Sequence, residues 1–268
     1  MHQVNMGPIQ ATLDDGTAAL GRPSWYRVLS VVLATGAILG LSVGFGAIVG
    51  FGFSWASGVS EAGAQAPGHF EALRTASLAV FLLAFQAASI VFTMIAVRWF
   101  PPQHKQLLTI GWPKSGWKAI LGALFLFIML LATLSLVVTS TNPEAFANDT
   151  KPFAELMQAR TWWLMLIAAG VGAPLAEELL FRGLVFGALR ETRLGFLGAA
   201  ILSSASWAVL HFQYSWMAIA MIVVMGLYFA WLREKTGSLL ASMICHGLYN
   251  GLIVLALALT AESTLQLG

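Results

Sequence analysis

The sequence predicts an all-α protein, a polytopic bundle of about seven transmembrane helices with a cytoplasmic N-terminus. Of the 268 residues, 58% are hydrophobic and only 10% are charged, and the mean hydropathy is +0.79. Soluble domains carry about 25% charged residues. The apolar residues gather in segments of about 20, the length that crosses a hydrocarbon core about 30 Å thick. Lys and Arg are also divided unequally between alternate connecting segments, as in multi-pass proteins.

Seven apolar segments can be assigned in order along the chain. They cover roughly 28–53, 76–97, 117–138, 162–189, 196–212, 215–233 and 238–260. Residues 1–24 lack the charged start and short apolar core of a signal peptide, so we expect a cytoplasmic tail there. Residues 25–268 then form a single transmembrane domain.

The basic residues orient this bundle. With the N-terminus inside, the inner connecting segments hold ten of the 14 Lys and Arg and the outer ones hold three, while Arg182 lies in a span. This distribution follows the positive-inside rule. The net charge of +2 gives no footprint for a nucleic-acid partner, and a single cysteine, Cys245, excludes an internal disulfide.

Glycines recur four residues apart in the first span. This spacing places small residues on one helix face and lets a second backbone approach closely. We expect packing against a neighbouring span of the same chain, which we favour over homodimerisation. The glycines are Gly36, Gly40, Gly44, Gly46 and Gly50.

Two adjacent carboxylates and a guanidinium interrupt the fourth apolar segment. Charged groups are costly at membrane depth and mark candidate functional sites. Pro174 predicts a break or kink just before them. Adjacent helical residues point about 100° apart, whereas Glu178 and Arg182 have the spacing of an ion pair. Glu177 is therefore the catalytic candidate, although a purely structural ion-pair network is an equal alternative for these residues taken alone.

Two histidines and an amide follow in later apolar segments. His211 alone is typical of an interfacial residue, and the i, i+4 pair His246 and Asn250 alone could form a hydrogen-bond clasp between helices. Straight helices would separate the two imidazoles by about 10–15 Å along the membrane normal, so strong tilts or different span ends are needed to bring them together. A carboxylate, two imidazoles and an amide donor together supply what amide hydrolysis requires.

These residues resemble the motifs of the CAAX-protease and bacteriocin-processing family, also called the Abi family, which includes prenyl-protein endopeptidases. The resemblance covers about residues 162–255, and the first three spans match only in hydropathy. An aromatic is kept in the second motif, but it is not the usual Phe. The motifs stand here as Glu177-Glu178-x-x-x-Arg182, Trp207-x-x-x-His211 and His246-x-x-x-Asn250.

The resemblance implies an intramembrane endopeptidase of the prokaryotic, inner-membrane type. Glu177 would act as general base on a water, which His211 would help to hold. His246 and Asn250 would stabilise the oxyanion of the scissile carbonyl. The supporting residues would be Glu178 and Arg182.

The resemblance favours a mechanism without metal or cofactor, although one Glu and two His could also ligate zinc. The expected partners are membrane lipid and a hydrophobic or lipidated peptide or protein.

Other chemistries and functions compete with this prediction. Neither a His-Glu-x-x-His nor a Gly-x-Ser-Gly motif occurs, and no aspartate lies in a span. Cys245 adjoins His246, but neighbouring helical side chains do not face each other, so a Cys–His nucleophile is disfavoured. A non-catalytic scaffold or bacteriocin-immunity-type binding protein remains an alternative. A transporter is a second one, which the absence of repeated halves disfavours.

Overall fold

The computed structural model describes residues 24–59, 67–100, 107–113, 116–157 and 159–266. The predicted cytoplasmic tail therefore lies outside the described residues except for Ser24, where the first helix begins. The described residues form helices and connecting turns without any strand. The predicted all-α membrane bundle is confirmed.

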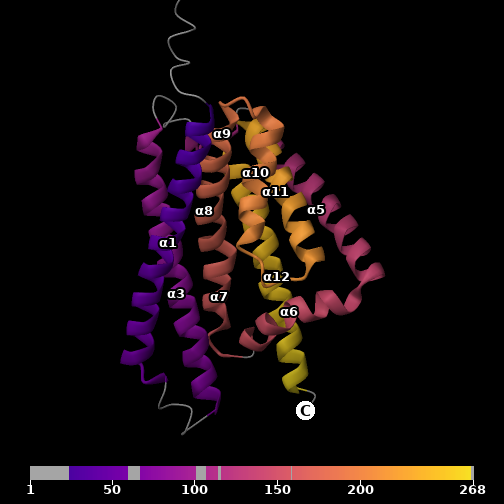
Figure 1. The fold of residues 1–268 in the computed structure, drawn as a ribbon. Helices are drawn as coiled ribbons and strands as arrows, with labels where there is room; N and C mark the ends of the chain where they lie inside the picture. Colours follow the sequence, from indigo (N-terminus) through magenta and orange to yellow (C-terminus); the bar gives the residue numbers. More distant parts are fainter. Residues whose placement is uncertain (1–23, 60–66, 101–106, 114–115, 158, 267–268) are drawn as a thin grey trace, which may run out of the picture.

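Each predicted apolar segment corresponds to a helix or a series of helices (Figure 1). Six of these are long and apolar enough to cross a membrane, whereas α10 has only 15 residues. At 1.5 Å per residue α10 is about 22 Å long, shorter than a hydrocarbon core. The number of complete crossings and the side of the N-terminus stay predictions. The helices outside the fourth segment are α1 (Ser24–Ala56), α3 (Pro67–Ala96), η2 (Val97–Trp99), α5 (Gly116–Thr141), α6 (Pro143–Met157), α10 (Gly195–Val209), α11 (Trp216–Thr236) and α12 (Leu240–Gln266).

The fourth segment is a single uninterrupted helix that changes its hydrogen-bond register. It runs as α7 (Trp162–Ile167), π-helical η3 (Ala168–Gly172), α8 (Ala173–Glu177), π-helical η4 (Glu178–Phe186) and α9 (Gly187–Arg190). Of the predicted break or kink at Pro174, the break is wrong, because Gly172 and Ala173 on its N-terminal side both keep helical dihedral angles. The change of register places the proline in the first turn of α8, where its missing N–H is tolerated.

The glycine face of α1 is used only in part. A Cβ atom on Gly46 or Gly50 would lie 2.9–3.2 Å from atoms of Phe81 in α3, so close packing against a neighbouring span is confirmed there. A Cβ atom on Gly36, Gly40 or Gly44 would meet nothing within 4 Å among the described residues.

Helix α6 occupies a region in which the sequence showed no motif. Asn142 caps it by accepting a hydrogen bond from the Ala145 N–H at 3.1 Å, and Pro143 and Glu144 follow in the first turn. These are ordinary helix-start signals. In Figure 1, α6 lies crosswise beneath the turn between α10 and α11, and this turn lies well short of the far end of α12.

The interior of the bundle is packed around η4. Phe181, Leu184, Trp207, Phe229 and Cys245 are all essentially inaccessible. Lipid is as apolar as these side chains, so close packing and polar contacts, rather than removal from water, hold such helices together. The polar site lies among these residues.

Candidate active site

The first turn of η4 forms a fully buried ion pair. Arg182 Nη1 lies 3.1 Å from Glu178 Oε1, and both side chains have no exposed surface. The two residues come four positions apart on one helix, as the sequence predicted. Each charge is uncompensated without the other, so the pair must be kept or lost together.

Aromatic rings enclose the guanidinium of Arg182. Its central carbon lies 4.3 Å from the centre of the Trp207 ring and 5.2 Å from that of Phe229. The three guanidinium nitrogens make no hydrogen bond of good geometry within the described residues. Ion pairing and cation–π stacking therefore hold the group in place. Gly226 of α11 provides the space that the guanidinium occupies, because a Cβ atom there would lie 3.1 Å from Arg182 Nη2.

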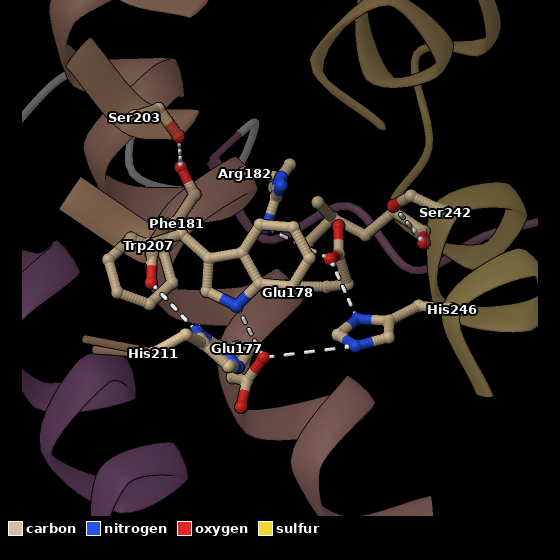
Figure 2. A network of polar contacts seen from close by, with 10 residues as sticks. Glu177, Glu178, Phe181, Arg182, Ser203, Trp207, His211, Ser242 and His246 are labelled. Atoms are coloured by element: carbon tan, nitrogen blue, oxygen red, sulfur yellow. Dashed lines mark hydrogen bonds and ion pairs between the residues drawn. The ribbon is translucent and has the colours of Figure 1, made fainter. Parts of the chain in front are cut away.

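Glu177 is the accessible carboxylate of the site. Its side chain is 20% exposed, against 0% for Glu178. Its Oε2 atom accepts a hydrogen bond from Trp207 Nε1 at 2.5 Å and lies 3.8 Å from His246 Nε2. Figure 2 shows the three side chains converging from α8, α10 and α12. The different directions predicted for the two glutamates are thus observed, and Glu177 alone has a route to an incoming molecule.

His246 lies between the two carboxylates. Its Nδ1 atom is 3.2 Å from Glu178 Oε1, while Nε2 faces Glu177 (Figure 2). The ring stacks on Phe229, with 5.4 Å between ring centres and 23° between planes. The ring thus bridges the partly exposed carboxylate of Glu177 and the fully buried carboxylate of Glu178.

His211 lies in the turn that follows α10, two residues after the helix ends at Val209. Its Nδ1 is 3.1 Å from the Trp207 carbonyl oxygen, and the ring centres of His211 and Trp207 are 5.6 Å apart. The same indole also contacts His246, with ring centres 5.2 Å apart. Helix α10 ends at Val209, three residues before the rough end predicted for the fifth segment, and both imidazoles contact the same indole.

The turn that carries His211 is attached to α6. Asp149 accepts hydrogen bonds from the Ser215 N–H at 2.8 Å and from the Ser215 hydroxyl at 2.6 Å. Phe153 stacks on Tyr214, and Tyr214 stacks on His211, with ring centres 6.0 and 5.8 Å apart. Burial raises the pKa of Tyr214 to about 12, so its hydroxyl stays uncharged beside the imidazole.

Asn250 contacts the main chain of η3. Its Nδ2 donates a hydrogen bond to the Ala169 carbonyl oxygen at 2.9 Å. One amide hydrogen is therefore engaged and the other stays available. The two residues of the third motif thus contact different parts of the fourth segment, His246 the glutamates and Asn250 the preceding π-helical turn.

Several contributors were missed from the sequence. Asp149 and Gly226 act across helices, which no local pattern reveals. Gly247 and Gly251 do carry a local signal, the four-residue spacing of small residues, on the same helix as His246 and Asn250. Trp207 was recognised only as an aromatic of the second motif, whereas it is the hydrogen-bond donor to Glu177.

The residues do not form an evident metal centre. Among the described residues, no three His, Cys, Asp or Glu side chains gather closely enough to hold a metal ion. The prediction of chemistry without a metal stays a prediction.

Similarity to known proteins is concentrated over the same region. Residues 159–252 match the family described as type II CAAX prenyl endopeptidase Rce1-like. A stretch of 109 residues is 28% identical to "Putative membrane peptidase YdiL" of Bacillus subtilis (strain 168), and covers 41% of this chain and 43% of that protein. A stretch of 81 residues is 31% identical to "UPF0177 protein YxdF" of Lactococcus lactis subsp. lactis (strain IL1403), and covers 30% of this chain and 43% of that protein.

Each match spans less than half the length of the curated relative. No solved structure matches the chain significantly. The matched region contains every residue of the three motifs, from Glu177 to Asn250. These matches confirm the predicted resemblance to the CAAX-protease and bacteriocin-processing family, and the Rce1-like similarity lies at residues 159–252.

Proposed function

We propose that this protein is an intramembrane endopeptidase that hydrolyses a peptide bond of a hydrophobic or lipidated peptide or protein. The observation that carries the proposal is the environment of Glu177. It is a partly exposed carboxylate in contact with Trp207 and His246, next to a second carboxylate that is fully buried. An ion-pair network that only pinned helices would leave no reason for one acidic side chain to stay accessible.

In this mechanism Glu177 takes a proton from a water molecule as the water oxygen attacks the scissile carbonyl carbon. His211, whose ring contacts that of Trp207, helps to orient the water. The Nε2–H of His246 and the second amide hydrogen of Asn250 donate to the developing oxyanion. When the C–N bond breaks, Glu177 passes its proton to the leaving nitrogen, which yields a carboxylic acid and an amine.

The buried pair supports this chemistry indirectly. Glu178 lies 3.2 Å from Nδ1 of His246 and holds the ring so that Nε2 points toward Glu177. Arg182 balances the charge of Glu178. The relatives in Bacillus and Lactococcus, together with six helices long and apolar enough to cross a membrane, support a location in a bacterial cell membrane.

The test compares membrane peptidomes of cells that express the wild type, Glu177→Gln or Glu191→Gln at matched levels. Glu191 is an exposed acid in the turn after α9 and serves as the control for loss of a charge. Peptides that occur with the wild type and with Glu191→Gln, but not with Glu177→Gln, support the proposal and reveal the cleavage site. Identical peptidomes from all three would favour a non-catalytic scaffold or immunity protein that binds through the same cluster.

A further inference from the structure

One carbonyl oxygen in η3 accepts its hydrogen bond from a side chain instead of from the main chain. In the π-helical register each N–H bonds to the carbonyl five residues earlier, and the Ala173 N–H donates to the Ala168 oxygen in this way. The next donor in that register would be residue 174, for the Ala169 oxygen. Pro174 has no N–H. The Ala169 oxygen instead accepts the hydrogen bond from Asn250 Nδ2, at 2.9 Å.

Glycines bring the two helices close enough for this contact. A Cβ atom on Gly247 would lie 2.8 Å from the Gly170 oxygen, and one on Gly170 would lie 3.4 Å from the Gly251 Cα. Both close approaches flank the Asn250 contact, because α12 presents Gly247, Asn250 and Gly251 along one turn. The backbones of η3 and α12 thus approach each other at the point where Pro174 removes a donor.

Gln86 of α3 supports the same turn from another side. Its Nε2 donates to the Ala168 oxygen at 3.0 Å, and Gly172 leaves the space that its amide occupies. The Ala168 oxygen thus has a main-chain and a side-chain donor, whereas Ala169 depends on Asn250. Gln86 of α3 and Asn250 of α12 thus both donate hydrogen bonds to this turn, which fixes the position of the Ala169 oxygen.

We propose that Pro174 is a positioning residue for Asn250. By removing one amide hydrogen it leaves the Ala169 oxygen as an acceptor that fixes the Asn250 side chain beside His246. Pro174→Ala returns a competing main-chain donor and loosens Asn250. For its effect on hydrolysis this inference rests on the proposed function, whereas the coupling between the two residues does not.

The first test is a cycle of thermal unfolding of the purified full chain in detergent. Asn250→Leu keeps the approximate volume and removes the donor, so the part-buried Ala169 oxygen is left without a partner. We expect it to lower the midpoint by about 3–10 °C. In the Pro174→Ala background the same substitution should lower the midpoint by less than half as much. Equal losses in the two backgrounds would overturn the proposal, and Pro174→Gly repeats the cycle if Pro174→Ala does not yield folded protein.

The second test is kinetic and uses a peptide found by the peptidome comparison. We expect Pro174→Ala to lower kcat by about 10- to 100-fold with little change in KM, because oxyanion contacts act only in the transition state. Pro143→Ala, at an exposed proline in the first turn of α6, should leave kcat unchanged. An unchanged kcat for Pro174→Ala would overturn the positioning role. If the wild type hydrolyses nothing, the proposed function fails, and the unfolding cycle still decides whether Pro174 and Asn250 are coupled.

Discussion

Glu177 and Glu178 are consecutive residues whose carboxylates face opposite nitrogen atoms of one imidazole ring. Oε2 of Glu177 lies 3.8 Å from His246 Nε2, and Oε1 of Glu178 lies 3.2 Å from His246 Nδ1. Only the first carboxylate is partly exposed, and only the second is paired with Arg182. The same chemical change at the two positions should therefore have different consequences.

Glu177→Gln should abolish hydrolysis and leave the midpoint of thermal unfolding within about 2 °C of the wild type. The amide oxygen can still accept the hydrogen bond from Trp207, but an amide cannot take a proton from water. Glu178→Gln should instead lower the free energy of unfolding by about 3–5 kcal/mol, because Arg182 is left as an uncompensated buried charge. Unfolding in detergent and turnover, measured on both variants, check this pair. Retained turnover in Glu177→Gln would remove Glu177 from its proposed role.

Gly226→Ala should destabilise the protein by about 1–3 kcal/mol, the usual cost of overpacking. The added Cβ would lie 2.7 Å from Ser204 Oγ and 3.1 Å from Arg182 Nη2, so the guanidinium must shift from its place between the rings. Gly122→Ala in α5 is the matched control, since its Cβ would meet nothing within 4 Å. The measurement is the midpoint of thermal unfolding of both variants. Equal midpoints would mean that the residues around Arg182 can move to accept the added Cβ at little cost.

Asp149→Ala should lower kcat by about 10- to 100-fold, because the turn that carries His211 loses its attachment to α6 and small displacements at a reacting centre are costly. Two hydrogen bonds to Ser215, at 2.8 and 2.6 Å, disappear in this variant. Glu155→Ala removes an exposed acid from the same helix and should retain activity. Steady-state kinetics on one peptide compare the three proteins, and equal kcat values would show that α6 does not position His211.

Removal of metal ions should leave turnover unchanged. The proposed general base acts on water directly, and the described residues do not bring three His, Cys, Asp or Glu ligands together. The measurement is hydrolysis after prolonged dialysis against a strong chelator, with and without added zinc. Loss of activity that zinc restores would contradict the glutamate mechanism and support the zinc alternative.

The sequence predicted the parts of the site better than their assembly. It identified Glu178 and Arg182 as an ion pair, because residues four apart on a helix meet whatever surrounds them. Of the break or kink expected at Pro174, the break does not occur. The physical reason is that a carbonyl oxygen without its main-chain donor can accept a hydrogen bond from another helix. The Ala169 oxygen accepts one from Asn250 in this way.

His211 is a second residue whose type the sequence identified but whose surroundings it did not predict. Hydropathy does not separate the end of α10 from the turn that follows, so the predicted span continued roughly to residue 212. Helix geometry alone could not show that His211 and His246 contact the same indole. In the structure the helix ends at Val209, and Asp149 holds the turn against α6. The segment that became α6 had no readable motif, because its residues Asp149 and Phe153 act through contacts with Ser215 and Tyr214 that only the fold creates.

Composition, hydrophobic length and helical spacing by themselves determined the all-α membrane class, the number of apolar segments and the ion pair of the fourth segment. These properties depend on the solvent and on neighbours in the chain, and both can be read from the sequence. The tertiary structure alone decided that Glu177 contacts Trp207 and His246, that Gly226 makes room for Arg182, and that Asn250 replaces a missing main-chain donor. Such contacts join residues that are distant in the sequence. Whether they form depends on how closely the helices of the whole bundle pack.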